Sequence, residues 1–253
     1  MKLVFLGNNY LGWQVLKWLK ETGREIVGLV IHPEEKQKYA DEIIKTAGLP
    51  NNRIFYGPSL KEADTLRAIA ALKADVGLSV MFDYVLKKDF LNIFPKGCFN
   101  LHPSYLPYNR GNYPNVWCIV DETPAGVTLH LVDEGVDTGP IVDQVEVEIE
   151  PIDTGLTLYR KLEQAGLRLF KKAWPLIEKG NYRLIPQDKN TGEFHKKRDV
   201  ERIDRIDLDR EYKARDLINI LRARTFPPYT GVFFEEDGKK VYMELKLSYG
   251  EEA

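Results

Sequence analysis

Two polar side chains alternate with apolar ones in a short run near the middle of the chain. Asn100 and His102 lie two residues apart in the run 98–102, and Pro103 follows directly. Residues two apart in an extended strand point to the same side of the sheet, so the amide and the imidazole lie together. Proline ends a strand, which places both groups at its carboxyl end. Polar groups buried there are costly unless something uses them, and an imidazole is suited to acid–base chemistry.

A second candidate for chemistry is the acidic loop 132–140. It follows an apolar run at 126–131 and carries three carboxylates, Asp133, Glu134 and Asp137, between glycines. A loop of this kind could bring Asp137 to His102. An aspartate in that position orients an imidazole and stabilises its charge, as in hydrolase triads. The alternative is that Asp133 and Asp137 only shape a turn, because Asp and Gly are common turn residues.

The elements that must position these groups alternate between strands and helices. We expect strands at 3–6, 26–31, 53–56, 76–80 and 126–131, and helices at 11–20, 34–47, 60–72, 156–178 and 213–223. Such alternation predicts an α/β fold: a doubly wound, mostly parallel sheet of Rossmann-like type with helices on both faces. Ligands of these sheets bind beyond the carboxyl ends of the strands.

The turn at residues 7–12 follows the first strand. It lacks the third glycine and the acidic residue of a dinucleotide site, and Gly12 is not followed by the Lys and Ser or Thr of a phosphate loop. Its position leaves two readings open, contact with a ligand or a plain tight turn.

The chain changes character after the long helix. We expect a catalytic domain at 1–185 and a smaller C-terminal extension at 186–253, built from a helix and a β-hairpin around Glu236, Asp237 and Gly238. The hairpin strands carry large apolar residues on both faces, and one face can pack against the helix at 213–223. We therefore predict a homodimer assembled through residues 230–247, the alternative being a hairpin that folds wholly onto its own domain.

Composition excludes several classes of function. The formal charge of −2 shows no bias toward nucleic acid or membranes, and the segment 196–215 carries eight basic against six acidic residues, which is typical of a self-paired surface. Two cysteines cannot form a disulfide framework, and clusters of metal ligands are absent from the sequence. We expect a cytoplasmic protein that uses no metal and binds neither nucleic acid nor membrane.

Two separated motifs give the chain a family resemblance. The run Asn100–Ser104 with Leu106 and Pro107, followed by Asp133–Ile141, resembles the formyltransferase family over about residues 1–179. The resemblance implies 10-formyltetrahydrofolate as formyl donor and an active site of Asn100, His102 and Asp137. An amide and a charged imidazole would stabilise the negative charge that develops on the formyl oxygen, while Asp137 takes a proton from the attacking amine.

Within that family, several segments of the chain are similar to the sugar N-formyltransferases. They are Tyr105–Gly111 with Asn115–Trp117, then Gln187 with Phe194–Arg198, and Leu221–Tyr229. The implied acceptor is the amine of a nucleotide-linked amino sugar, such as a thymidine diphosphate 4-amino-4,6-dideoxy sugar. Methionyl-tRNA formyltransferase, hydrolysis of formyltetrahydrofolate and a nucleotide-binding regulator without turnover stay as alternatives. The tRNA enzymes carry a longer C-terminal domain, the hydrolases carry an extra N-terminal one, and a regulator would not need the intact catalytic set.

The expected ligand contacts fall into two sets. The folate donor is expected at Met81, Phe82, Asp83, Tyr84, Leu131, Val132, Asp133, Gly135 and Val136. The nucleotide-sugar acceptor is expected at Asn9, Tyr10, Ser104, Tyr105, Tyr108, Asn109, Arg110 and Gly111. Alternative readings make Arg110 a surface ion-pair partner and Tyr105 and Tyr108 packing aromatics. His130 and His195 are expected to be structural.

Overall fold

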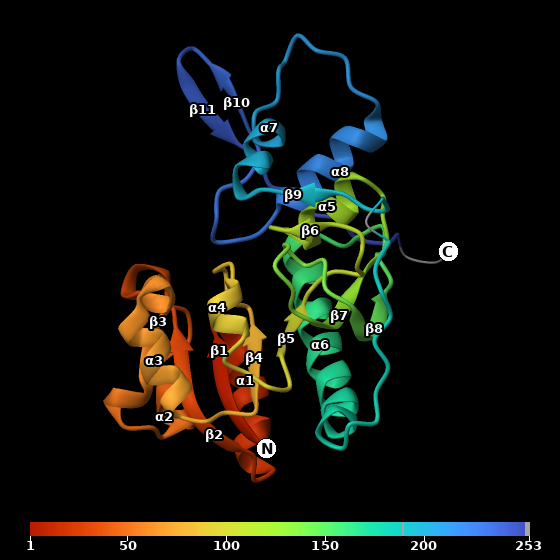
Figure 1. Cartoon of the computed structure of the whole chain (residues 1–253). Helices are drawn as coiled ribbons and strands as arrows, with labels where there is room; N and C mark the ends of the chain where they lie inside the picture. The colour runs from red at the N-terminus through yellow and green to blue at the C-terminus, as the bar shows by residue number, and fades with distance from the viewer. Residues whose placement is uncertain (189, 251–253) are drawn as a thin grey trace.

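The computed structural model describes residues 1–188 and 190–250, and a seven-stranded sheet forms its centre (Figure 1). The strand order is β3-β2-β1-β4-β5-β7-β8. The strands are β1 (Lys2–Gly7), β2 (Glu25–Ile31), β3 (Ile54–Tyr56), β4 (Val76–Val80), β5 (Cys98–His102), β7 (Ala125–Leu131) and β8 (Ile141–Val147). The five strands from β3 to β5 run parallel, whereas β7 and β8 pair in antiparallel fashion. The predicted fold class, a mostly parallel doubly wound sheet, is confirmed.

Helices cover both faces of this sheet. They are α1 (Asn9–Glu21), α2 (Ala40–Ala47), α3 (Ala63–Ala71), α4 (Lys88–Leu91), α5 (Pro114–Val120) and α6 (Gly155–Glu178). In β1, Leu3 and Phe5 join the core beneath α1 and α6, and Val4 and Leu6 join a second core beneath α3 and α4. Strands buried on both faces need continuous apolar runs, and the sequence of β1 is such a run.

The long helix α6 begins and ends as its sequence indicates. A reciprocal capping box joins Thr154 and Thr157 at its start, and Gly180 adopts a left-handed φ of 68° just beyond its end. Its buried side, which includes Phe170 and Trp174, packs on β7 and β8. This packing supports the antiparallel half of the sheet, where the acidic loop arises.

Two predicted helices are broken. The expected helix at 34–47 is a 3₁₀ turn, η1 (Glu34–Lys36), followed by α2, because Tyr39 is left-handed with φ 59°. A tertiary contact causes the break: Asn8 Oδ1 accepts from Lys38 N at 2.8 Å, and Asn9 N donates to Lys38 O at 3.0 Å. The expected helix at 60–72 is likewise η3 (Gly57–Lys61) followed by α3.

The segment 7–12 is not a plain tight turn, and contact with a ligand there stays a prediction. Helix α1 begins at Asn9, so Gly12 lies inside the helix, next to the carbonyl oxygen of Val80. The close approach of helix and strand there leaves little room for a side chain at position 12.

The C-terminal part of the chain is tied to the rest through several elements. Strand β6 (Arg110–Gly111) pairs with β9 (Phe194–His195), and after η4 (Lys197–Val200) and α7 (Glu201–Asp204), α8 (Ala214–Arg224) packs on α5. Arg222 Nη1 donates to Glu150 O at 3.0 Å and Asp153 O at 3.1 Å. These contacts join the extension firmly to the loop before α6.

The predicted hairpin is present as β10 (Phe233–Glu236) and β11 (Lys239–Tyr242), with Asp237 and Gly238 left-handed in the turn. Its backbone contact with the preceding chain is made by Ile206 N, which donates to Phe233 O at 2.8 Å. In Figure 1 the hairpin projects beyond the body of the chain, beside α7. Tyr242 is 49% exposed and Val241 41% exposed. Within the described residues, no helix has the length and apolar character needed to cross a membrane.

Candidate active site

The structure gathers Asn100, His102 and Asp137 into one cluster at the carboxyl end of β5. His102 Nε2 lies 3.5 Å from Asp137 Oδ2, and Asn100 Nδ2 lies 3.4 Å from Asp137 Oδ1. All three side chains are largely buried. The 3.5 Å separation is too long for a good hydrogen bond, and His102 Nε2 is without a hydrogen-bond partner among the described residues. A buried imidazole nitrogen of this kind is open to bond a ligand.

A second histidine belongs to this cluster, although we expected it to be structural only. His130 is directly opposite Asn100 in the antiparallel ladder between β5 and β7. Its Nε2 is 3.2 Å from Asn100 Nδ2 and 3.7 Å from Asp137 Oδ1. One signal in the sequence could have found it: His130 is a polar residue in an apolar strand that leads into the acidic loop.

The neighbours of His130 determine its protonation. Its Nδ1 is 3.1 Å from Leu131 O, which can only accept, so Nδ1 carries the hydrogen and Nε2 accepts from Asn100. Burial lowers the pKa of His130, and the nearby charge of Asp137 opposes this only in part. A neutral His130 therefore directs the amide nitrogen of Asn100 toward itself and Asp137.

Asp137 is held in an unfavourable backbone conformation. Its φ is 54°, in the left-handed region, which costs a non-glycine residue about 1 kcal/mol. The carboxylate accepts from Gly111 N at 3.0 Å, and the carbonyl oxygen accepts from Gln187 Nε2 at 2.9 Å. Inside the loop, Asp133 Oδ1 accepts from Gly135 N and Thr138 Oγ1, so Asp133 shapes the turn. These contacts together over-determine the position of the Asp137 carboxylate.

The two segments expected to hold the donor lie in the same half of the sheet. Phe82 and Val132 both pack against the core beneath α3 and α4, and Lys88 pairs with Glu134 at 3.5 Å. Met81 begins its segment with a left-handed φ of 56° just after β4. Strand β4 is hydrogen-bonded to β5, so this turn and the Asn100 strand are neighbours.

His32 anchors the segment after β4, a residue that sequence reasoning did not single out. Its ring centroid is 5.1 Å from Phe82 and 5.4 Å from Tyr84, and its Nε2 is 3.2 Å from Asp83 N. Burial lowers the pKa of His32, which favours the neutral ring that such a contact requires. Its place one residue after β2, at a carboxyl strand end, is the signal that could have found it.

Several residues expected to contact the acceptor make contacts within the chain instead. Ser104 Oγ donates to Tyr108 O, and the buried Asn109 donates from Nδ2 to Thr123 Oγ1 at 2.7 Å. Tyr105 packs beside Gly126. These side chains serve the local structure, so substrate contact through Ser104, Tyr105, Tyr108 and Asn109 stays a prediction.

Arg110, Asn9 and Tyr10 have atoms left for a ligand. Arg110 Nη2 donates to Gly192 O at 3.2 Å, and Arg110 Nε and Asn9 Oδ1 have no hydrogen-bond partner in the described part of the chain. Tyr10 is 42% exposed and lies beside Trp13 and Tyr39.

A line of side chains leads from Asn9 to the C-terminal extension. Asn9 Nδ2 donates to Tyr159 Oη at 3.3 Å, and the ring of Tyr159 is 5.5 Å from Phe226. Phe226 contacts Tyr229, which is 55% exposed and has Lys38 Nζ 5.2 Å from its ring centre. An exposed aromatic ring next to a cation is suited to bind a flat, anionic ligand.

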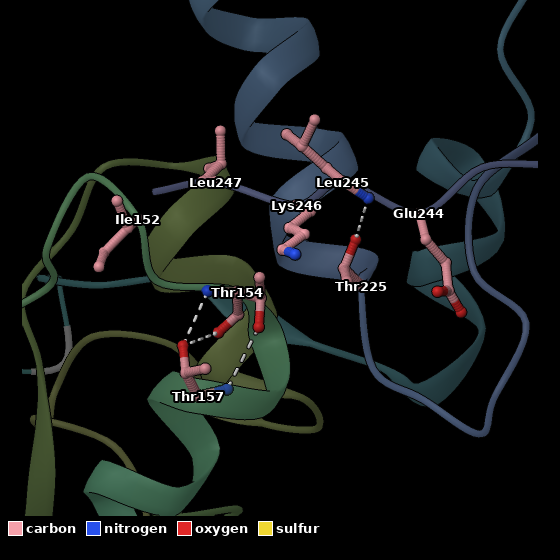
Figure 2. Close-up of a pocket in the computed structure, with 8 residues that line it drawn as sticks. All are labelled: Ile152, Thr154, Thr157, Thr225, Glu244, Leu245, Lys246 and Leu247. Carbon is pink, nitrogen blue, oxygen red and sulfur yellow. Dashed lines mark hydrogen bonds between the residues drawn. The ribbon is translucent and has the colours of Figure 1, made fainter. Parts of the chain in front are cut away.

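A pocket of about 520 Å³ lies elsewhere, at the start of α6 (Figure 2). It is bordered by Thr154, Thr157, Thr225 and the segment 244–247. Its hydroxyl groups already bond within the chain: Thr225 Oγ1 accepts from Leu245 N at 3.0 Å, and Thr154 and Thr157 cap each other. None of the residues of the Asn100 cluster lines it, so this pocket is separate from the candidate active site.

The chain is similar to several known proteins. A curated relative, the methionyl-tRNA formyltransferase of Synechococcus sp. (strain JA-3-3Ab), is 33% identical over 246 residues, covering 92% of this chain and 74% of that protein. The crystal structure of a 4-N formyltransferase from Francisella tularensis is 27% identical with a TM-score of 0.83, and the match covers 98% of both chains.

A further solved structure carries ligands. It is the formyltransferase PseJ from Anoxybacillus kamchatkensis, in complex with UDP-4,6-dideoxy-4-formamido-L-AltNAc and tetrahydrofolate. It is 31% identical with a TM-score of 0.57, and the match covers 80% of this chain and 89% of that one. Two family models match in sequence order: formyl transferase over residues 1–173, and N-formyltransferase dimerization C-terminal domain over residues 199–249. The chain belongs to the formyl transferase family.

Proposed function

We propose that this enzyme transfers the formyl group of 10-formyltetrahydrofolate to the amine of a nucleotide-linked amino sugar. The observation that carries the proposal is the cluster of Asn100, His102 and Asp137, in which His102 Nε2 has no hydrogen-bond partner in the part of the chain that the structure describes. The match to a 4-N formyltransferase over nearly the whole of both chains supports it, as does the formamido sugar bound to PseJ. A thymidine diphosphate 4-amino-4,6-dideoxy sugar is one acceptor of this class.

The three side chains have separate roles in this reaction. The folate supplies an activated formyl carbon when it is bound. His102 Nε2 donates a hydrogen bond to the formyl oxygen as negative charge develops there. Asn100 adds a second donation by exchanging its long 3.4 Å contact with Asp137 for the formyl oxygen, while His130 keeps the amide nitrogen directed inward. Asp137, fixed by Gly111, accepts the proton that the attacking amine loses. The bond between the formyl carbon and N10 of the folate would then break, and N10 would take up a proton as tetrahydrofolate leaves.

The donor fits the segments 81–84 and 131–137. Phe82 and Val132 pack against one core. The two segments would offer backbone donors and acceptors to the edges of a pterin ring, with Val132 and Val136 beside its faces. Hydrogen exchange can test this placement: 5-formyltetrahydrofolate should slow exchange in residues 131–137. Measurable binding without protection there would place the pocket elsewhere.

The acceptor fits the surface between Asn9 and Tyr229. The nucleobase would stack on the exposed ring of Tyr229, and the diphosphate would lie near Lys38. A Tyr229→Ala variant should raise KM for the sugar nucleotide with little change in kcat, because base stacking is equal in ground and transition states.

Methionyl-tRNA formylation is the second candidate, because the Synechococcus relative bears that name. Charge argues against it. Within the basic-looking segment 196–215, Arg202 pairs with Asp199, and Arg205 pairs with Glu235 of the hairpin. With six acidic residues against eight basic ones, the segment has a net charge of only +2 for phosphate groups.

The proposal includes a homodimer formed through residues 230–247. The exposed hairpin and the match of a dimerization model to residues 199–249 support it. The function itself is tested by offering 10-formyltetrahydrofolate with a panel of thymidine and uridine diphosphate amino sugars and seeking the formamido product by mass spectrometry. A panel without any formylated product would contradict it.

A further inference from the structure

Gln187 lies in the segment between α6 and β9, far along the chain from the acidic loop, yet its side chain binds that loop. Its Nε2 is 2.9 Å from Asp137 O and 2.6 Å from Gly139 O. Both hydrogens of one amide nitrogen are therefore donated to the same short turn. A fork of this kind ties two carbonyl oxygens of the loop to one point outside it.

The chemistry of the contact requires an amide. Gln187 Oε1 is buried without a hydrogen-bond partner among the described residues. No donor near Oε1 therefore favours the opposite orientation of the amide, in which the oxygen and nitrogen exchange places. Reversal would point Oε1 at two carbonyl oxygens, which cannot donate. A carboxylate at position 187 would face the same repulsion, and an apolar side chain would leave both carbonyl oxygens without this donor.

The anchored atom belongs to the strained residue itself. Asp137 has φ 54°, and Gln187 holds the carbonyl oxygen of that same residue, so it restrains the backbone on which the carboxylate is mounted. Gly139 lies close against Leu131 O, where an added Cβ would collide. The loop thus depends on an outside contact at its strained end.

The same C-terminal segment also restrains the carboxylate. Gly111 N donates to Asp137 Oδ2, and Gly111 lies between two backbone bonds of the β6–β9 pair. These are Arg110 N to Glu193 O at 3.0 Å and Asn112 N to His195 O at 2.9 Å. A Cβ at position 111 would press against His195 O, so the two strands are in close contact.

We propose that Gln187 is a positioning residue that holds Asp137 in its left-handed conformation, and that Gln187 together with strand β9 completes the active site from the C-terminal side. The inference rests on the role given to Asp137 in the proposed function. It concerns an amide that acts through another residue and does not itself touch the reacting atoms.

Two near-isosteric variants test the donor fork, with a matched control. Gln187→Met keeps the length and removes both donors, Gln187→Glu also adds repulsion, and Gln164→Glu makes the same change at an exposed site of α6. Hydrogen exchange of peptides spanning 131–140 should quicken by about fivefold or more in both position-187 variants, since two hydrogen bonds are lost. The control should exchange like the wild type.

The kinetic constants and their pH dependence distinguish a positioning role of Gln187 from a general loss of stability. Displacing a catalytic group by about 1 Å costs on the order of a hundredfold, so kcat should fall by about tenfold or more with KM changed less. The activity of Gln187→Glu relative to wild type should recover as pH falls toward the pKa of the new carboxyl, because the protonated acid regains one donor. Gln187→Met should show no such recovery.

Two results would overturn the inference: wild-type exchange and kcat in Gln187→Met, or a Gln187→Glu variant whose relative activity is independent of pH. If Gln187→Met unfolds, Gln187→Asn replaces it, and the shorter amide should likewise lose protection at 131–140. The exchange measurement needs no substrate. If the wild-type protein formylates no amino sugar but the position-187 variants exchange faster as expected, only the proposed function is contradicted.

Discussion

His130 lies behind Asn100, with the Nε2 of the imidazole 3.2 Å from the amide nitrogen. The two residues are a directly opposed pair of the β5–β7 ladder, so the backbone register itself sets their distance. Because His130 Nδ1 donates to Leu131 O, the ring can only accept from Asn100. The orientation of the Asn100 amide is thus determined by a buried, neutral histidine.

This neutrality predicts a pH-dependent stability. Burial lowers the pKa of His130, and likewise the pKa values of His32 and His195, whereas an unfolded histidine has a pKa of about 6.5. As pH falls, these histidines therefore take up protons in the unfolded chain before they do so in the folded chain. Their contribution to the free energy of unfolding is complete above about pH 6.5 and is lost as pH falls below that value. We expect the melting temperature to fall between pH 7.5 and pH 5.5, and less so in His130→Gln. Equal pH dependence of the two proteins would contradict this.

A second prediction concerns turnover. Replacing His102 or Asn100 by alanine removes one donor to the formyl oxygen, which should reduce kcat by about a hundredfold or more. Neither side chain belongs to the apolar core, so the circular dichroism spectrum should be unchanged. Full activity in a correctly folded variant would remove that residue from the mechanism.

Asp137 can be altered without changing its backbone. Asparagine tolerates the left-handed region, so Asp137→Asn removes the charge while φ stays near 54°. We expect a lower kcat and a changed pH–rate profile, with the affinity for 5-formyltetrahydrofolate changed less. Asp137→Ala should lose stability in addition. A pH–rate profile identical to the wild type would make the carboxylate purely structural.

Periodicity was enough to predict the elements that carry the site. The alternation of Asn100 and His102 in an apolar run, ended by Pro103, predicts where β5 stops and which side chains share a face. The break at Tyr39 could not be predicted from the sequence. It depends on a hydrogen bond from Lys38 N to the side chain of Asn8, which lies thirty residues before Lys38 in the chain. Contacts between distant segments decide such breaks, and local propensity does not contain them.

Two site residues likewise depend on contacts between distant segments, which one sequence does not reveal. His130 enters the cluster only through the register of an antiparallel pair, and one sequence does not reveal which strands pair. Gln187 was noted for its resemblance to sugar N-formyltransferases, but its bond to Asp137 O spans fifty residues and requires the fold. Asp137 itself was predictable as a carboxylate in a glycine-rich loop, although its left-handed backbone was not.

The hairpin leads to a prediction about assembly. Phe233 and Tyr242 face each other across it at 5.7 Å between ring centres, and Tyr242 is half exposed. Burying one such side chain is worth about 2 kcal/mol, so a twofold partner should cover them. Light scattering should find a dimer at micromolar concentration, converted to monomer by Phe233→Asp with Tyr242→Asp but not by Lys239→Ala at the turn. A monomeric wild type would contradict the dimer.

The most direct test of the account is a comparison of two acceptors with one donor. The wild-type enzyme is given 10-formyltetrahydrofolate with either a nucleoside diphosphate 4-amino sugar or methionyl-tRNA, and kcat/KM is measured for each, with His102→Ala as the inactive control. The account predicts formylation of the sugar amine, confirmed by the mass of the formamido product, with methionyl-tRNA unmodified. Formylation of methionyl-tRNA while every amino sugar stays unmodified would contradict it.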